Sequence, residues 1–288
     1  MTDLVAIQHQ AVFYALCYRE FWAEVYLLQT QPKFPSTLSK ESELAPSIRR
    51  DFRLGLIGCG NVGSCIVEGL LSCGMFHPTQ ITISTRRPEL LEHFSSRGIV
   101  VVDDNAKVAN TCQLVILAVA SRHLKNCCPS VRACIDTSSV PGQFWISVLG
   151  DIVPEKLQQQ LSSLRSVAVV GTALCMQEFE ESAAQEASPF VLQKHPNFGD
   201  STLIDRAYFD QAGAMAVRFV AALRDCGLEF GLGKETAEYT AIKFAFSSDS
   251  VASTVFLPNG GSQAIGNALN DHVRRMLSVS YKPETFYL

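Results

Sequence analysis

Residues 54–63 read Leu54-Gly55-Leu56-Ile57-Gly58-Cys59-Gly60-Asn61-Val62-Gly63. A short apolar run, typical of a buried strand, is followed at once by the spacing G-x-G-x-x-G, and a helical pattern of apolar residues then continues as far as Gly74. The apolar run Ile81-Thr82-Ile83-Ser84 comes at the distance expected for the second strand of a strand–helix–strand unit. Because two strands and a helix frame the glycines, the stretch predicts a Rossmann-type dinucleotide-binding unit.

Each glycine of this loop has a separate physical task. Gly58 permits the tight turn after the strand, Gly60 lets a pyrophosphate approach the backbone, and Gly63 lets the helix pack closely on the strand. The start of the helix would offer unpaired N–H groups and a positive dipole end to the phosphates. We therefore expect cofactor contacts at Gly58, Cys59, Gly60, Asn61, Val62 and Gly63. The alternative is an ordinary strand–turn–helix with incidental glycines.

The end of the second strand indicates which dinucleotide is bound. Sites for NAD usually carry Asp or Glu there, which accepts a hydrogen bond from the ribose 2′-hydroxyl. This sequence has Ser84-Thr85-Arg86-Arg87 instead, and its first acidic residue, Glu89, comes after a proline. Two hydroxyls and two guanidiniums suit a 2′-phosphate, which arginine binds bidentately. The sequence predicts NADP(H); the alternative is a solvated turn in which the two arginines face water.

Strands and helices continue to alternate after this unit. Apolar runs predict strands at 98–102, 114–119 and 144–149, and helical patterns begin near residues 105 and 154. A cysteine-rich connector precedes the strand at 144–149, and after residue 200 only helical patterns remain. The predicted fold class is α/β, a Rossmann-type doubly wound parallel sheet followed by a smaller all-α domain.

The chain divides into four predicted parts. Residues 1–50 form an N-terminal helical extension and linker, residues 51–175 the dinucleotide-binding domain, residues 176–206 a connector, and residues 207–288 a helical substrate or dimerisation domain. Within the first part, apolar residues recur at Val12, Leu16, Phe21 and Val25, which predicts an amphipathic helix. This extension precedes the main fold, and its role is not readable from the sequence.

Composition excludes several classes of function. The formal charge of −4 gives no reason to expect nucleic acid or an anionic membrane as a partner, and no apolar run approaches the length of a membrane span. Ten cysteines lie scattered, without a C-x-x-C pair or a His/Cys cluster at metal-ligand spacing. We therefore expect a cytoplasmic protein with reduced thiols and no metal. No motif typical of hydrolysis or phosphoryl transfer is present.

Several stretches beyond the glycine loop carry a family resemblance. They lie at residues 56–62, 104–106, 115–119, 145–148, 154–157 and 223–232, with a fainter one at 258–265. On these residues the chain resembles the pyrroline-5-carboxylate reductase family over about residues 52–276. It is more similar still to the divergent branch of that family called NADP-dependent oxidoreductase domain-containing proteins.

The resemblance implies a Rossmann domain joined to a helical domain that forms a homodimer, with a small molecule as substrate. It also implies NADP(H) contacts at the glycine loop, at Ser84, Thr85, Arg86 and Arg87, at Asn105, and at Ala118 and Val119. Asn105 could instead cap the helix that follows it, and the two roles are compatible.

The sequence departs from the family where the substrate would bind. Residues 120–121 are Ala-Ser in place of a Lys-Pro pair, residues 165–169 lack a Met-Pro-Asn-Thr segment, and residues 212–216 lack the Pro and Tyr of a Gly-Pro-Ala-Tyr segment. The family's Pro-Gly-Gly-x-Thr loop reads Pro-Asn-Gly-Gly-Ser-Gln at 258–263. Ser262 is therefore the candidate catalytic hydroxyl, or else the N-cap of the last helix.

Three functional hypotheses follow. The first is an NADPH-dependent oxidoreductase of the pyrroline-5-carboxylate reductase type, which reduces a small imine or carbonyl. The second is a catalytically inactive NADP-binding protein with a sensing or scaffolding role. The third is a dehydrogenase of the β-hydroxyacid type, for which Lys243 is the candidate catalytic lysine. His123, just after the fourth strand, is either a proton donor or a surface histidine.

Overall fold

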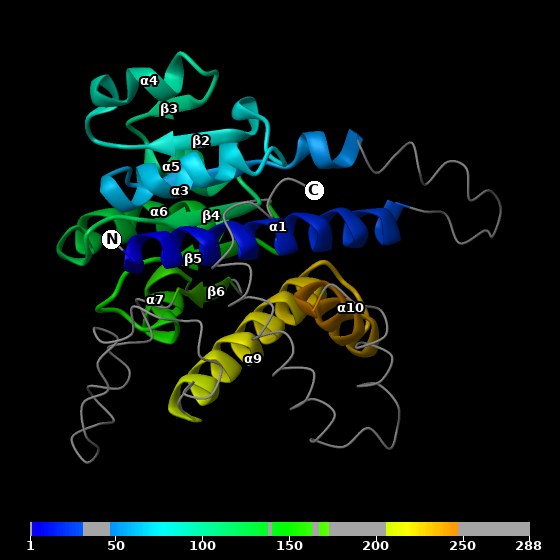
Figure 1. The fold of residues 1–288 in the computed structure, drawn as a ribbon. Coiled ribbons are helices and arrows are strands. Elements are labelled where there is room, and N and C mark those ends of the chain that lie inside the picture. The colour runs from blue at the N-terminus through cyan, green and yellow to red at the C-terminus, as the bar shows by residue number, and fades with distance from the viewer. Residues whose placement is uncertain (1, 31–46, 138–139, 163–166, 173–205, 247–288) are drawn as a thin grey trace.

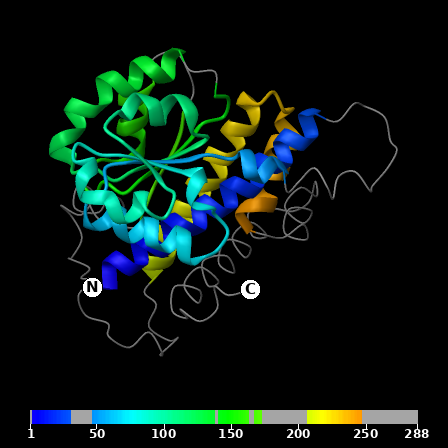
Figure 2. The same ribbon diagram turned by 90° about the horizontal axis from the view of Figure 1, so that it is seen from above.

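The computed structural model describes residues 2–30, 47–137, 140–162, 167–172 and 206–246. Within them, six parallel strands form one sheet in the order β3-β2-β1-β4-β5-β6. The strands are β1 (Leu54–Ile57), β2 (Ile81–Ser84), β3 (Val100–Val102), β4 (Leu114–Leu117), β5 (Phe144–Ser147) and β6 (Ala168–Gly171). This order, with helices on both faces, confirms the predicted Rossmann-type doubly wound sheet followed by helices (Figures 1 and 2).

All strands run in the same direction, so their carboxyl ends meet at one edge of the sheet. β1 is paired with β2 on one side and with β4 on the other, and Ile57 lies level with Ser84 and Leu117 at this edge. The strand order therefore reverses between β1 and β4. In open α/β sheets, ligands bind beyond the carboxyl ends of the strands at such a reversal.

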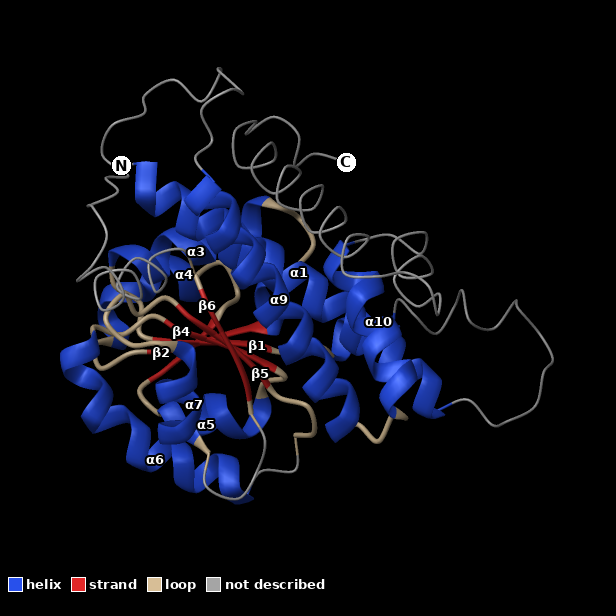
Figure 3. Cartoon of the chain, turned by 90° about the horizontal axis from the view of Figure 1, so that it is seen from below, coloured by secondary structure: helices blue, strands red, loops and turns tan. Residues whose placement is uncertain are grey.

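Helices cover both faces of the sheet (Figure 3). One face is covered by α5 (Asn105–Thr111), α6 (Leu124–Thr137) and α7 (Pro154–Leu161). The other face is covered by α1 (Thr2–Thr30), α3 (Asn61–Ser72) and α9 (Arg206–Glu229). Helix α10 (Lys234–Phe246) packs on α9 and α1. Leu54 and Leu56 of β1 belong to the hydrophobic cluster of the second layer, whereas Ile57 belongs to that of the first. Both faces are buried, so the strands are apolar on both sides.

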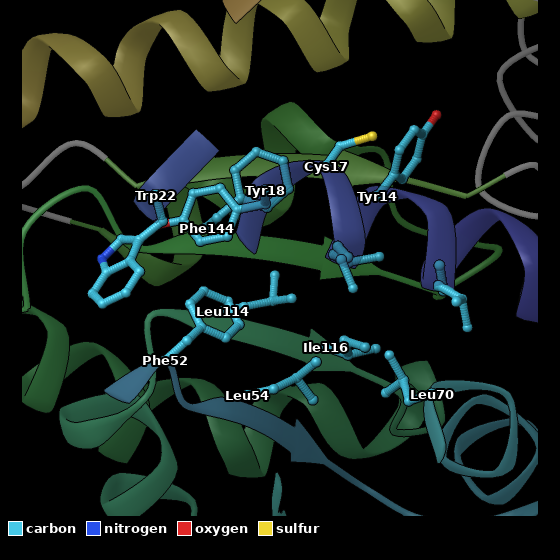
Figure 4. Close-up of a cluster of buried hydrophobic side chains, with 14 of the residues drawn as sticks. Tyr14, Cys17, Tyr18, Trp22, Phe52, Leu54, Leu70, Leu114, Ile116 and Phe144 are labelled. Carbon is cyan, nitrogen blue, oxygen red and sulfur yellow. The ribbon is translucent and has the colours of Figure 1, made fainter. Parts of the chain in front are cut away.

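Helix α1 is part of the hydrophobic core, which differs from the extension expected ahead of the main fold. Tyr18 and Phe21 are fully buried, and the Tyr18 ring stacks on Phe144 of β5 with centroids 4.7 Å apart. Tyr14 stacks on Phe219 of α9 at 4.4 Å. Figure 4 shows the α1 side chains lying over those of β1, β4 and β5. The helix is buried on several sides because it lies between the sheet and the C-terminal helices.

Other differences from the sequence-based expectation are local. The segment expected as a cysteine-rich connector forms α6, a helix that includes Pro129. The edge strand β6 was not predicted, because its four residues are too few to show a pattern. The helices α9 and α10 confirm two of the three expected after residue 200, and the third, at residues 265–276, lies outside the described residues. The bounds of the four predicted parts of the chain stay a prediction.

Candidate functional site

The glycine turn follows β1 directly. Gly58 has a φ of +87°, and its N–H donates a hydrogen bond to the carbonyl oxygen of Ser84 at 2.9 Å. A Cβ at this position would lie 2.7 Å from Cγ1 of Val119 and 2.9 Å from the carbonyl oxygen of Ala118. Residue 58 is therefore held to glycine both by its backbone conformation and by the close approach of the chain after β4. This is the tight turn that the sequence predicts.

Gly63 and Gly60 differ in what surrounds them. A Cβ at Gly63 would lie 2.7 Å from the carbonyl oxygen of Gly58, so a side chain there would push α3 away from the turn. A Cβ at Gly60 would meet nothing within 4 Å, and the Gly60 backbone is extended, with φ −85° and ψ −158°. The fold itself therefore does not require glycine at position 60. The open space above it is what a close approach of a phosphate group requires.

Helix α3 begins with hydrogen-bond donors that nothing in the helix satisfies. Its N-cap is Gly60, which brings no side chain, and its first turn contains no acidic residue. The first backbone bond of the helix runs from the N–H of Ser64 to the carbonyl oxygen of Gly60 at 2.8 Å, so the N–H groups before it have no intrahelical acceptor. These donors and the positive end of the helix dipole favour an anion at this point.

Ser84 and Asn105 are joined beside the turn. Ser84 is 1% exposed, and its hydroxyl donates to Oδ1 of Asn105 at 2.7 Å. Asn105 is the first residue of α5, but the cap of that helix is Asp104, whose side chain accepts from the N–H of Ala106 at 2.8 Å. The alternative role of Asn105 as the helix cap is therefore wrong. The buried hydroxyl of Ser84 fixes the Asn105 amide and leaves its NH₂ group to donate elsewhere.

Cys127 of α6 also belongs to this cluster, although no site role was predicted for it from the sequence. Burial raises the pKa of its thiol, while a hydrogen bond from Asn105 and the positive charge of Arg86 lower it in part. The contact between α5 and α6 brings Asn105 and Cys127 together, and Arg86 reaches them from the turn after β2. The only sequence signal at this position was an adjacent pair of cysteines, which does not indicate what lies beside them.

Arg86 and Arg87 are exposed beyond the end of β2. Nη2 of Arg86 lies 3.4 Å from Nε2 of His123, and Nε of Arg122 donates to the same nitrogen at 3.4 Å. The pKa of His123 is lowered by its partial loss of hydration and then by the charges of Arg86 and Arg122. A neutral imidazole that accepts from arginine suits a role in placing Arg86, rather than the role of proton donor.

Of the remaining predicted site residues, the structure describes Ala118, Val119 and Lys243 but not Ser262. Ala118 and Val119 follow β4 and contact the glycine turn. Lys243 of α10 lies 3.8 Å from Oε1 of Glu24 in α1, and its Nζ is 5.5 Å from the ring centroid of Phe244. An ion pair with α1 explains this lysine without a catalytic role, which does not favour the β-hydroxyacid dehydrogenase hypothesis. Ser262 lies outside the described residues.

The described part of the chain also bears on metal sites and membrane spans. In that part, no group of three or more His, Cys, Asp or Glu side chains is arranged to hold a metal ion. None of the helices in the described ranges combines the length and apolar character needed to span a bilayer. The cysteines resolved there are all free thiols. The glycine turn, the Ser84–Asn105 pair and the Arg86 cluster are therefore the features that point to a ligand at the carboxyl edge.

Comparison with known proteins agrees with this geometry. Residues 53–150 match the family of NADP oxidoreductases described as coenzyme F420-dependent. The pyrroline-5-carboxylate reductase of Pisum sativum is 22% identical over 224 residues, which cover 73% of this chain and 81% of that protein. The NADP-dependent oxidoreductase domain-containing protein 1 of Mus musculus is 32% identical over 109 residues, which cover 37% of this chain and 29% of that protein.

A solved pyrroline-5-carboxylate reductase from Coxiella burnetii aligns with 80% of this chain and 98% of its own, at 17% identity and a TM-score of 0.38. The predicted resemblance to the pyrroline-5-carboxylate reductase family is confirmed by the sequence comparisons, and it is distant. The match to the coenzyme F420-dependent NADP oxidoreductase family covers β1 to β5, and the glycine turn, Arg86 and Asn105 lie inside it.

Proposed function

We propose that this chain, a distant relative of the pyrroline-5-carboxylate reductases, binds NADP(H) beyond the carboxyl ends of β1, β2 and β4 and uses it to reduce a C=N or C=O group of a small molecule. The observation that carries the proposal is the glycine turn. Gly58 and Gly63 are required by the fold, whereas Gly60 stands in open space at the start of α3. A glycine that the fold does not need, placed where a helix offers free N–H groups, is explained by a phosphate that approaches it.

The residues present fit the parts of the cofactor. The turn at 58–60 and the first N–H groups of α3 would hold the pyrophosphate, as the predicted contacts at Cys59, Asn61 and Val62 imply. Arg86 and Arg87 would hold the ribose 2′-phosphate, because both guanidiniums are exposed at the end of β2. Asn105 would donate its amide to the cofactor, and Ser84 would act on the cofactor only through Asn105, because its hydroxyl is buried.

The bound dinucleotide would supply a hydride, and the protein would supply position and exclusion of water. Ala118 and Val119, after β4, would form the wall against which the cofactor lies, because they already contact the turn. The alternative function, an NADP-binding protein without catalysis, rests on the departures at residues 120–121 and 258–263, which remove substrate contacts of the family. The homodimer implied by the family stays part of this proposal.

Gly60→Val tests the site without disturbing the fold. A Cβ at position 60 meets nothing within 4 Å in the free protein, so the variant should still fold and lose at most the small advantage of glycine over valine at the N-cap of α3. It should nevertheless lose binding of both NADPH and NADH, because the valine side chain would occupy the space of the pyrophosphate. Unchanged affinity for both cofactors would remove the glycine turn from the site.

Substitution of Arg86 and Arg87 tests the choice of cofactor. Hydrogen bonds to charged groups contribute about 1.5–3 kcal/mol each, so Arg86→Gln should weaken NADPH by about tenfold to a hundredfold and leave NADH nearly unchanged. Calorimetric titration with both dinucleotides measures the difference, and equal losses for both would overturn the assignment. Oxidation of NADPH in the presence of pyrroline-5-carboxylate then separates a reductase from a binding protein.

A further inference from the structure

A second polar cluster lies at the opposite edge of the sheet from the glycine turn. The short helix at residues 47–51 leads into β1, and residues 74–80 lead into β2, so both lie where the strands begin (Figure 1). With Arg19 of α1, these two segments line a pocket of about 370 Å³. This volume is at the lower end of the range of about 300–1,000 Å³ that small-molecule sites occupy.

The pocket carries an excess of positive charge. Its lining includes Arg19, Arg49 and Arg50, and none of the described residues that line it is a carboxylate. Two of these arginines share one ion-pair partner outside the lining: Glu20 pairs with Nη2 of Arg19 at 3.1 Å and with Nη2 of Arg49 at 2.7 Å. The guanidinium of Arg50 is exposed and has no partner among the described residues. Three arginines against one glutamate leave two positive charges without a carboxylate partner among the residues that the structure describes.

Arg19 is the unusual member of this group, because only 5% of it is exposed. One of its terminal nitrogens donates to the carbonyl oxygen of Met75, but its Nε has no hydrogen-bond partner in the described part of the chain. Burial lowers the pKa of the guanidinium, the charge of Glu20 raises it in part, and the charge of Arg49 lowers it again by a smaller amount. Glu20 is shared with Arg49, so a further anion at this point would be favourable for the buried charge.

The walls of the pocket are held in place by Gln80. Its side-chain NH₂ donates to the carbonyl oxygens of Arg49 at 2.6 Å and Phe52 at 3.1 Å, and its Oε1 accepts from the N–H of His77 at 2.9 Å. This amide therefore ties the segment before β1 to the segment before β2. Sites whose walls are fixed before binding lose less entropy when the ligand arrives.

His77 adds a hydrogen-bond donor to the lining. Its Nδ1 accepts from the N–H of Thr79 at 3.4 Å and lies 2.8 Å from the Thr79 hydroxyl. In either tautomer the imidazole keeps one ring N–H as a hydrogen-bond donor. The pocket thus combines guanidinium and imidazole donors in one fixed wall, and this set matches the oxygens of a phosphate group.

We propose that this pocket, lined by Arg19, Arg49, Arg50 and His77, binds a small molecule that carries a phosphate monoester, as a site separate from the dinucleotide site. The two uncompensated positive charges match a dianion. Arg50 would contact the phosphate directly, since its guanidinium is exposed at the opening, and Arg19 would act from beneath through its buried charge. The ligand is recognised at the edge where the strands begin, whereas the dinucleotide is expected at the edge where they end.

The test uses inorganic phosphate as the probe, with the full chain and sodium chloride of equal ionic strength as the blank. The parent for this test carries Gly60→Val, Arg86→Gln and Arg87→Gln, so that phosphate bound at the glycine turn or at the two arginines of the dinucleotide site does not contribute. Calorimetric titration should show one phosphate site in this parent. Arg50→Gln should weaken that site about tenfold or more, the effect of losing one charge-assisted hydrogen bond. Arg50 is exposed, so the variant should keep the melting temperature of its parent without phosphate.

Arg132→Gln is the matched control. Arg132 is an exposed arginine of α6, on the other face of the sheet, and it has no partner among the described residues. The control removes the same charge and should leave phosphate binding unchanged. Equal affinity of the Arg50→Gln variant and its parent, or equal losses in both variants, would overturn the proposal. Malonate, a dicarboxylate dianion, should bind more weakly than phosphate, and binding of equal strength would overturn the assignment to a phosphate group.

Discussion

Removal of the Phe21 side chain tests whether α1 is part of the cooperative fold. Phe21 is fully buried, and its ring lies 6.2 Å from the ring centroids of Tyr18 and of Phe244 in α10. A Cβ placed at Gly227 of α9 would lie only 3.4 Å from the tip of this ring, so little space is available for collapse around a smaller side chain. We therefore expect Phe21→Ala to leave a cavity.

The expected cost is about 3–5 kcal/mol, the range for replacing a buried Phe by Ala. Folded domains are stable by about 5–15 kcal/mol, so the variant should lose about a fifth or more of its free energy of unfolding. Leu28→Ala is the control on the same helix, because Leu28 is 47% exposed. Its effect should stay within about 0.5 kcal/mol, as for other surface substitutions.

Equilibrium unfolding in urea measures both quantities. Trp22 lies in α1 and Trp145 in β5, so variants that keep one tryptophan at a time report separately on the helix and on the sheet. If α1 belongs to the cooperative unit, the two signals share one midpoint, and Phe21→Ala moves both to lower urea. An earlier transition for Trp22, or an unchanged midpoint in the Phe21→Ala variant, would show that α1 is an independent extension.

Two further predictions concern the carboxyl edge. Gly58→Ala should destabilise the chain by about 1–2 kcal/mol because alanine disfavours the left-handed backbone, and by more because its Cβ would meet the carbonyl oxygen of Ala118. Gly74→Ala is the control in thermal unfolding, because Gly74 also has a positive φ but lies in open space. Equal losses would contradict the close approach at Gly58. Arg86→Gln should raise the pKa of His123 toward its ordinary value, which an NMR titration measures. Because the pKa of His123 is lower in the folded chain than in the unfolded chain, the free energy of unfolding falls as the pH drops below about 6.5, and the Arg86→Gln variant should lose less of it over that range. An unchanged pKa of His123 in the variant would show that Arg86 does not act on His123.

The central fold could be predicted from the sequence because its signals are local. The G-x-G-x-x-G spacing is itself a local signal, and two of its tasks agree with the structure: Gly58 has a φ of +87°, and a Cβ at Gly63 would lie 2.7 Å from the carbonyl oxygen of Gly58. The close approach of Ala118 and Val119 to Gly58 is a long-range contact that the spacing does not show. The parallel strands were visible as apolar runs because both faces of the sheet are buried. Spacing alone therefore identified both the sheet and the edge at which a ligand is expected.

The placement of α1 could not be predicted, because it depends on contacts between distant residues. The Tyr18 hydroxyl donates to the carbonyl oxygen of Gly142 at 2.5 Å, across 124 positions of the chain. Arg19 and Glu20 interrupt the apolar run in the sequence, yet in the structure they pair with each other. Cys127 and the pocket at Arg19 were missed for the same reason, because their neighbours come from separate elements.

Helix α1 has a consequence for the proposed reductase, because it touches both halves of the described chain. Near its start, the side chain of Gln8 donates to the carbonyl oxygen of Cys65 in α3 at 2.7 Å, and α3 is the helix that begins at the glycine turn. Near its end, Gln29 donates to the carbonyl oxygen of Phe230 after α9, and Glu24 pairs with Lys243 of α10. One rigid helix thus holds α3 and the C-terminal helices together. The orientation of a bound dinucleotide relative to those helices is therefore set by a segment that precedes the glycine turn by some thirty residues.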